Sequence, residues 1–349
     1  MAGERKRVVY FDYLKALLVF FVVVGHALDP FVDNVGAKAL FLTIYSFHMP
    51  LFIFLSGYFA KWNWKKCVAY FLIYIFVSAI YTAVKLISTS STKISFMSVL
   101  NGFIYPQWTL WFLLAMPFWL LTTKLIKNVK VWHICLAVVL TLAIGFVPLK
   151  GTFLTYSRIF YFMPAFLFGR WCRQNKDKFL KAVEKMRRVD VKVVSAIMLT
   201  LTLVLMLFVF KDLKHSFFYG NGRYKNPIDL VWRIVCLLIG GANSFAIMML
   251  TPYRQEKMVG SWPVSLSKFG ERTFSIYLFH TPLLMVFKTY LAVYFEANLF
   301  TILIAVLMVS YITIIISSSK PLAKVSDYML NILELKKKPR VEKTEETLK

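Results

Sequence analysis

Charged residues are scarce in this chain. Asp, Glu, Lys and Arg together make up 17% of its 349 residues, whereas a soluble domain usually carries about a quarter. Apolar residues reach 59%, and the 33 Phe, 18 Tyr and 9 Trp are typical of lipid-facing helices and of the aromatic belts at a membrane surface. The composition excludes an ordinary soluble domain and favours an integral membrane protein.

Several chemical signatures are also missing. The sequence has no P-loop, Rossmann glycine pattern, nucleophile elbow or HExxH pair, which argues against the common soluble enzyme classes. Its four cysteines, Cys67, Cys135, Cys172 and Cys236, lack the spacing of a metal site. No helix-turn-helix, zinc-finger or RNA-binding signature accompanies the basic charge. We therefore expect neither a bound metal nor a nucleic-acid partner.

Long apolar stretches recur along the chain. Each spans roughly 17 to 24 residues, the length that crosses a bilayer as a helix. They cover residues 11–29, 38–60, 67–87, 108–124, 131–149, 153–170, 190–210, 227–250, 273–295 and 298–318. The sequence thus predicts an all-α fold, a polytopic bundle of about ten transmembrane helices. Residues 1–320 would form the membrane domain, and 321–349 a cytoplasmic amphipathic segment with a charged, disordered tail.

The net charge is +25, and the distribution of the basic residues predicts the orientation of the bundle in the membrane. If the N-terminus is cytoplasmic and the spans alternate, 30 of the 42 Lys and Arg residues fall inside, 8 outside and 4 within spans. This bias satisfies the positive-inside rule and places both termini in the cytoplasm. The basic run over residues 170–192 carries apolar residues at helical spacing, which favours a surface helix against anionic membrane lipids. We expect a multi-pass protein of the plasma membrane.

Ionisable residues inside a span are the strongest functional signal, because each is costly to insert. Lys15 and His26 are eleven residues apart, so they share one helix face about 16 Å apart along the axis. Asp12 lies one turn before Lys15, and Asp29 about one turn after His26. Lys15 can snorkel to the interface and His26 can bond a neighbouring helix. A proton-transfer role for His26 is the hypothesis we favour.

Two further histidines precede prolines within predicted spans. His48 is followed by Pro50, and His280 by Pro282. A proline frees a backbone carbonyl, which is tolerated where protein or water bonds it again. His48 can therefore line a cavity or bond the freed backbone, and for His280 taken alone a packing role is favoured.

Two arginines also fall inside predicted spans. Arg158 lies in 153–170 and Arg233 in 227–250. Buried guanidinium groups need anionic partners, and the spans offer few acids, so an anionic ligand such as a phosphate is one solution. The alternative is pairing with backbone carbonyls, or with Asp229 one turn from Arg233.

Four motifs in four spans resemble the acyltransferase 3 family of membrane O-acyltransferases, in the branch of fucose 4-O-acetylases. They are Tyr10–Lys15 with His26 beyond it, Phe47–Phe52 with Ser56–Tyr58, Leu110–Leu113, and Ser275–His280. The first is the most specific, because the family shows Arg or Lys, ten residues and then His. The four motifs follow the family's order over nearly the whole chain.

The resemblance implies transfer of an acetyl group from cytoplasmic acetyl-CoA to a hydroxyl of a cell-surface or lipid-linked glycan. His26 would act as the general base or carry the acyl group, and Asp29 would orient its ring or stabilise the imidazolium. Lys15, with Arg158 and Arg233, would bind the CoA phosphates or substrate, and His48 and His280 would line the substrate site. Two other classes remain open: a transporter or flippase for a polysaccharide precursor, and a membrane glycosyltransferase using a lipid-linked sugar.

Overall fold

The computed structural model describes residues 9–88, 96–253, 269–295 and 298–334. Within these ranges every regular element is a helix, so the all-α prediction is confirmed. The helices are α1 (Tyr10–Leu28), α2 (Val35–Phe59), α3 (Trp64–Ser88), α4 (Phe96–Ile104), α5 (Trp111–Leu125), α6 (Val131–Ala143), α7 (Tyr156–Gln174), α8 (Lys176–Lys185), α9 (Val189–Phe208), α10 (Ile228–Leu250), α12 (Thr273–Val286), α13 (Leu299–Ser317) and α14 (Lys320–Asn331). Short helical turns join them: η1 (Asp29–Phe31), η2 (Ile144–Phe146), η3 (Phe153–Thr155), η4 (His215–Phe217), η5 (Phe287–Leu291) and η6 (Ala292–Phe295).

The expected spans all fall on helices, which makes the chain a multi-pass membrane protein. Of the described helices, seven are long and apolar enough to cross a bilayer: Tyr10–Phe31, Val35–Phe59, Trp64–Ala83, Val189–Phe208, Ile228–Leu250, Thr273–Phe295 and Leu299–Ser317. Trp111–Leu125 and Val131–Phe146 are apolar but shorter. α7 carries Arg158, Arg170 and Arg173 and is not among the seven. The count of ten and the cytoplasmic placement of both termini stay predictions.

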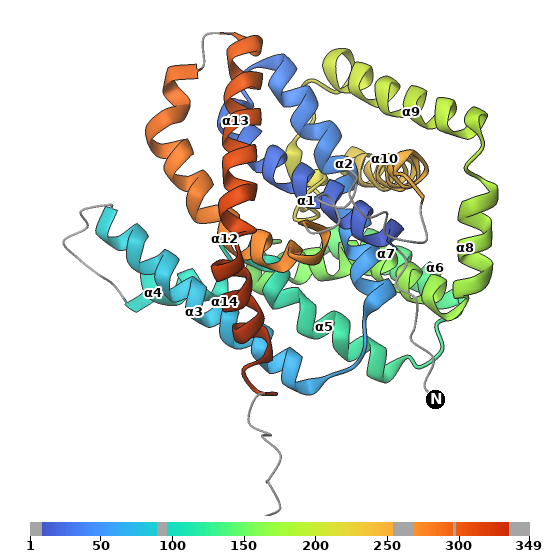
Figure 1. The fold of residues 1–349 in the computed structure, drawn as a ribbon, viewed down its shortest axis with the longest axis horizontal. Helices are drawn as coiled ribbons and strands as arrows, with labels where there is room; N and C mark the ends of the chain where they lie inside the picture. The colour runs from blue at the N-terminus through green and yellow to red at the C-terminus, as the bar shows by residue number, and fades with distance from the viewer. Residues whose placement is uncertain (1–8, 89–95, 254–268, 296–297, 335–349) are drawn as a thin grey trace, which may run out of the picture.

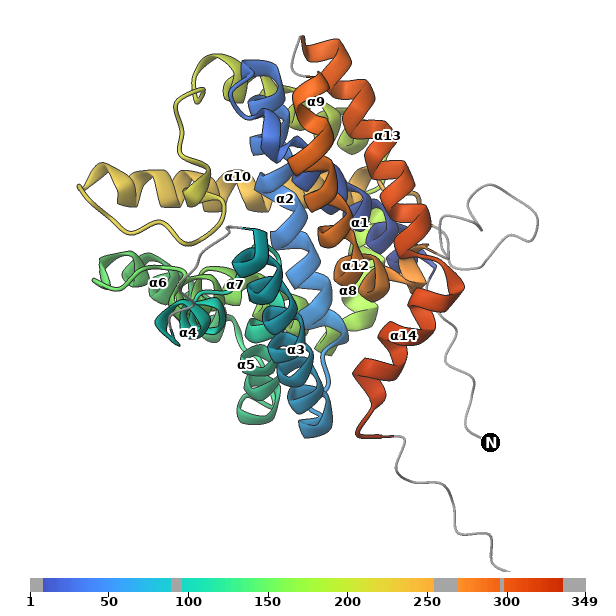
Figure 2. The same cartoon turned by 90° about the vertical axis from the view of Figure 1, so that its left-hand side faces the viewer.

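The centre of the bundle is formed by α1 and α2 (Figures 1 and 2). In their most apolar stretches 72% and 67% of the residues are buried, against 17% for α9, which lies at the edge. α2 packs against α1, α7, α9 and α10. Most ionisable side chains on α1 and α2 are thus surrounded by protein, so their partners must come from the protein and not from water.

The contact between α2 and α7 depends on two glycines. A Cβ atom on Gly57 of α2 would lie 2.0 Å from the carbonyl oxygen of Phe166, and one on Gly169 of α7 would lie 1.9 Å from that of Phe54. Small residues allow membrane helices to bring their backbones together. This packing fixes α7, and with it Arg158, against the helix that carries His48.

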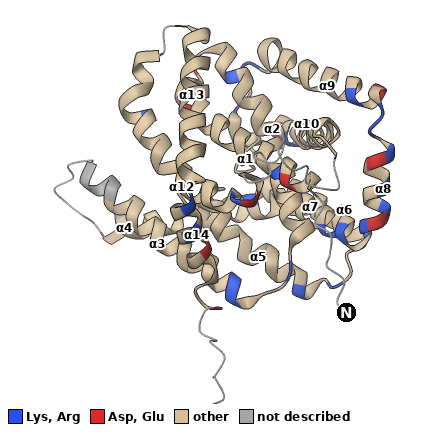
Figure 3. Ribbon diagram, in the orientation of Figure 1, with Lys and Arg blue, Asp and Glu red and all other residues tan. Residues whose placement is uncertain are grey.

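Charged residues gather at the ends and edges of the bundle. Figure 3 shows acids and bases alternating along α8, whereas α9, α10 and α13 are mostly uncharged. α8 forms within the basic run as predicted, with Val183 buried; its contact with lipid headgroups stays a prediction. α14 packs against α3 and α12 and lies within the expected cytoplasmic segment. The basic N-terminus at 5–7 and the tail at 335–349 lie outside the described residues.

Candidate active site

The last turn of α1 faces a cavity of about 270 Å³. Its walls come from α1, α2, α5, α7, α12 and the segments that precede α5 and α10. The lining residues are Val19, Val22, His26, Asp29, Tyr45, His48, Met49, Phe52, Trp108, Thr109, Trp111, Phe112, Arg158, Phe162, His215, Phe218, Tyr219 and Tyr277. Aromatic walls with a few converging polar groups are typical of small-molecule sites.

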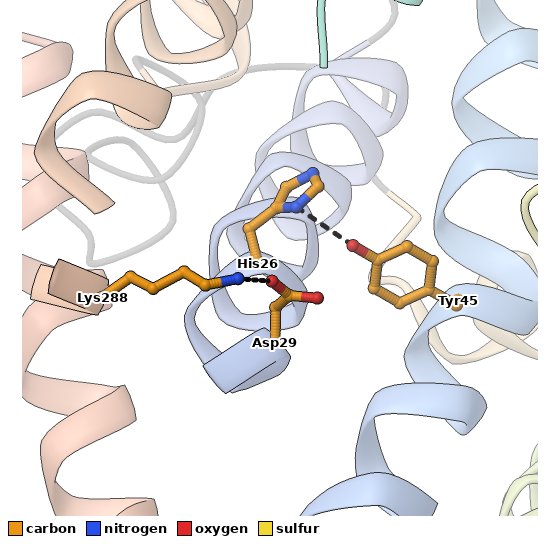
Figure 4. Close-up of polar contacts among 4 residues, drawn as sticks. All are labelled: His26, Asp29, Tyr45 and Lys288. Carbon is orange, nitrogen blue, oxygen red and sulfur yellow. Dashed lines mark hydrogen bonds and ion pairs between the residues drawn. The ribbon is translucent and has the colours of Figure 1, made fainter. Parts of the chain in front are cut away.

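His26 is held by a tyrosine of α2. The hydroxyl of Tyr45 lies 3.0 Å from Nδ1 of His26, and the two rings meet edge to face (Figure 4). Tyr45 is 6% exposed, so little water competes for this bond. The ring of His280 lies 5.4 Å from that of His26, centroid to centroid. Sequence analysis missed Tyr45, although it lies within one helical turn of His48.

His48 and His280 are fixed by backbone carbonyls. Nδ1 of His48 donates to the carbonyl of Ile44 at 2.8 Å, and Nδ1 of His280 donates to those of Ile276 and Tyr277 at 3.0 and 2.8 Å. Because a carbonyl only accepts, Nδ1 carries the proton in both rings and Nε2 keeps its lone pair when the ring is neutral. The carbonyl that His48 bonds is not the one four residues before Pro50, so of the two alternatives for His48 the structure does not show the bond to the freed backbone. His48 also lines the cavity, whereas His280 lies behind His26.

Asp29 does not take the place expected for it beside His26. Its carboxylate accepts from the ammonium of Lys288 at 2.6 Å (Figure 4), and among the described residues Tyr45 is the partner of His26 Nδ1. Lys288 lies in η5 and also lies over the ring of Trp108, 5.2 Å from its centroid. The ion pair is part-exposed and borders the cavity. Tyr45 thus takes the position at His26 Nδ1 that was expected for Asp29, and Asp29 forms an ion pair at the rim of the cavity.

The two intramembrane arginines have different surroundings. Arg158 lines the cavity, with its guanidinium over the rings of Trp111 and Tyr219 at 5.0 and 5.7 Å. Its Nη2 donates to the amide oxygen of Asn221 at 3.2 Å once that amide is oriented to satisfy both of its atoms. Within the described residues its Nε has no hydrogen-bond partner. This leaves a cation with spare donor capacity beside His26.

Arg233 is engaged by the protein backbone. Its guanidinium donates to the carbonyl of Thr141 at 2.9 Å and to that of Gly222. Asp229, the alternative partner, instead accepts from the backbone N–H groups of Lys225 and Asn226. Arg233 is 1% exposed and is not among the described residues that line the cavity. The sequence left two roles open for Arg233, binding an anionic ligand and pairing within the protein. Its geometry matches the second, through backbone carbonyls.

Lys15 lies at the opposite end of α1 from the cavity. Its ammonium pairs with the carboxylate of Asp12 at 3.0 Å and lies over the ring of Phe59, 5.2 Å from the centroid. The continuous helix keeps Lys15 and His26 on one face, about 16 Å apart along the axis. The structure thus places His26 in the cavity and Lys15 outside it, although both residues belong to the first motif.

A third cavity histidine comes from the segment before α10. His215 lines the cavity, and its ring lies 5.0 Å from that of Tyr219. Burial lowers the pKa of His215, although the nearby Asp29 carboxylate opposes the shift. Sequence analysis missed His215 because its segment is not apolar. The chain has only five histidines, so the rarity of this residue type could have marked His215 as a candidate.

Metal ligands do not converge in the described part of the chain. No group of three or more His, Cys, Asp or Glu side chains there could hold a metal ion. The chemistry available at the cavity is that of imidazole, phenol and guanidinium groups, which transfer protons and stabilise negative charge.

Comparison with known proteins assigns the family. The acyltransferase domain of the acyltransferase 3 family matches residues 8–318. The chain belongs to this family. This acyltransferase is 26% identical over 202 residues to nodulation protein NolL of Sinorhizobium fredii, covering 52% of this chain and 54% of that protein. It is 39% identical over 61 residues to NolL of Mesorhizobium japonicum, covering 16% of each.

These curated relatives are matched over limited lengths. The chain spans about half of the Sinorhizobium protein and a smaller part of the Mesorhizobium protein. No solved structure matches the acyltransferase. The family therefore gives the enzyme class, a membrane acyltransferase, and the geometry around His26 must carry the argument about donor and acceptor.

Proposed function

We propose that this acyltransferase moves an acetyl group from cytoplasmic acetyl-CoA to a hydroxyl of a cell-surface or lipid-linked glycan, at the cavity around His26. The observation that carries the proposal is the Tyr45–His26 bond at 3.0 Å inside an aromatic cavity that also holds Arg158. It provides a fixed imidazole and a cation at one place. Aromatic walls suit the apolar faces of a sugar ring.

The general-base step requires one tautomer of His26. Nδ1 carries the proton and donates to the Tyr45 oxygen, which leaves the lone pair on Nε2. Nε2 takes the proton from the acceptor hydroxyl as its oxygen attacks the thioester carbonyl. The new C–O bond forms, the C–S bond breaks, and the imidazolium returns the proton to the departing CoA sulfur. Attack by His26 itself, through an acyl-imidazole, would use the same geometry.

Arg158 supplies the positive charge for this step. Attack on a thioester places negative charge on the carbonyl oxygen, and a preformed cation in a low-dielectric site stabilises that charge strongly. The position of Arg158 among the rings of Trp111 and Tyr219 keeps the guanidinium in the cavity. The donor would reach this point from the Lys15 end of α1, where the ammonium would bind a CoA phosphate.

The test is compositional analysis of surface glycans from cells with and without the gene. We expect ester-linked acetate to disappear from a glycan that is still made and exported. Loss of the glycan itself would instead indicate a flippase for its precursor. A glycan that lacks a sugar residue would indicate a glycosyltransferase.

The proposed orientation in the plasma membrane has its own test. Reporter fusions after Lys127, Arg188 and the C-terminus are expected to report cytoplasm, and fusions near Thr92 and Asn221 the outside. An outside signal at Arg188 would overturn the ten-span topology.

A further inference from the structure

A second and larger cavity opens on the surface of the bundle. Its volume is about 800 Å³, within the range of ligand sites. Side chains from α2, α6, α7, α8 and α10 line it, and Phe168 and Leu238 are exposed at its edge. We call it the α7–α10 groove. Two of the helices that line it, α2 and α10, are long and apolar enough to cross a bilayer, and α8 borders one end.

Two adjacent glycines of α10, Gly240 and Gly241, line the groove and have no side chains to fill it. A Cβ atom added to Gly241 would meet nothing within 4 Å, although Gly241 lines the groove. Its neighbour Gly240 approaches the carbonyl oxygen of Ser46 on α2, 2.9 Å from an added Cβ. One glycine thus brings α10 close to α2, and the other leaves open space beside it.

The groove is lined at one end by a charged residue, and Tyr161 and Ser244 add uncharged polar groups to its wall. Of its described lining residues, Lys178 alone is charged, and Asn175 lies near it at the junction of α7 and α8. Phe179 and Val183 of α8, with Met186 directly after it, line the same end with apolar groups. The rest of α8 carries lysines at positions 176, 181 and 185 and acids at positions 177 and 184, all outside the lining. An apolar slot with one lysine at its end complements a hydrocarbon chain attached to an anionic headgroup.

The groove is separate from the active-site cavity. Phe162 lines both and is 3% exposed, and its ring stacks on Trp111 with centroids 5.4 Å apart. A chain in the groove would lie behind this wall, away from His26. The groove is therefore a site of its own and not an extension of the acceptor site.

We propose that the α7–α10 groove binds one acyl chain of an anionic phospholipid, with the phosphate at Lys178 and the chain along Phe168 and Gly241. A phospholipid can enter the groove laterally from the bilayer, and it supplies both the acyl chain and the anionic headgroup. The charge of Lys178 selects the headgroup, and the space beside Gly241 accepts the chain.

The test is photocrosslinking of the full-length protein in lipid nanodiscs, which does not depend on acyl transfer. Phosphatidylglycerol with a diazirine on its chain is compared with the matching phosphatidylcholine probe. We expect severalfold more labelling by phosphatidylglycerol, on peptides from 161–172 and 236–249. Gly241→Leu fills the groove and should abolish this labelling, whereas Gly241→Ala adds one methyl group and should keep it.

The headgroup is tested by a second pair of variants on α8. Lys178→Gln should remove the preference for phosphatidylglycerol, and Lys181→Gln, which is outside the lining, should keep it. Equal labelling by the two probes in the unaltered protein would overturn the proposal, as would full labelling of a folded Gly241→Leu protein. Displacement of the probe by a polyprenyl phosphate but not by unlabelled phosphatidylglycerol would assign the groove to an isoprenoid lipid carrier and overturn the proposal as well.

Discussion

The two ends of α1 differ, although they belong to one motif and one helix face. At the His26 end the ring is held by Tyr45 and backed by His280, inside a cavity that also contains Arg158. At the Lys15 end the ammonium pairs with Asp12 and lies over Phe59, outside that cavity. A motif defined by spacing can thus place its residues in two different surroundings, one enclosed in a cavity and one outside it.

This difference has a physical origin. A buried proton-transfer group must be held in one orientation by neighbouring elements, because misplacement costs rate. A charge that binds phosphate works through a longer-range and less directional attraction, so it tolerates an exposed position. Substitutions at the His26 end should therefore change the rate constant, and substitutions at the Lys15 end should change donor affinity.

The largest expected effect is at His26. His26→Ala should lower transfer by about 10² to 10⁴, because it removes the general base. The variant should still insert in the membrane and bind acetyl-CoA, which separates it from a folding defect. Rate per folded molecule is the measurement, with His48→Ala and His280→Ala as comparison variants whose activity and stability should fall together. Retention of more than about a tenth of the activity would rule out the general-base role.

The two arginines provide the next test. Arg158→Ala should lower the rate by about 10² to 10³ with little change in melting temperature, because it removes charge stabilisation at the cavity. Arg233→Ala should mainly lower stability, by about 1–3 kcal/mol for each buried carbonyl left without its donor. Thermal unfolding and initial rates are measured on both. The reverse result, an unstable Arg158→Ala and a stable but inactive Arg233→Ala, would exchange their roles.

A smaller effect is expected at Lys15. Lys15→Ala should raise the KM for acetyl-CoA by about tenfold with kcat nearly unchanged, in the range of one lost bond to a charged group. Lys15→Arg should keep most of the affinity, and the remaining affinity should fall as salt rises. Binding and kinetics in detergent at two salt concentrations measure this. An unchanged KM in Lys15→Ala would move the donor site elsewhere.

The smallest effects should distinguish Tyr45 from Asp29 as the group that orients His26. Tyr45→Phe loses one hydrogen bond, worth about 0.5–1.5 kcal/mol, and should slow transfer about threefold to tenfold. Asp29→Asn breaks a part-exposed ion pair with Lys288, worth about 0–1 kcal/mol, and should slow it less. Lys288→Met should slow transfer as much as Asp29→Asn does, and the double variant should slow it no further. A greater loss in Asp29→Asn than in Tyr45→Phe would return the orienting role to Asp29.

The sequence predicted the class of fold because hydropathy and helical phase are local properties. Each predicted apolar stretch falls on a described helix, and the eleven-residue spacing places Lys15 and His26 on one face whatever surrounds them. The intramembrane position of His26 also marked it as a candidate, since an ionisable ring there is costly. These conclusions needed no knowledge of which helices are neighbours.

Only the tertiary structure decided the partners. The bond from Tyr45 to His26 joins α2 to α1, the Asp29–Lys288 pair joins residues 259 apart, and the position of His215 depends on how the segment before α10 folds back. Arg158 and Arg233 are both arginines within predicted spans, so the sequence does not distinguish them. Helix packing places Arg158 in the cavity and Arg233 against backbone carbonyls. A charge inside a membrane needs a partner, but the identity of that partner depends on helix packing, which no single stretch of sequence contains.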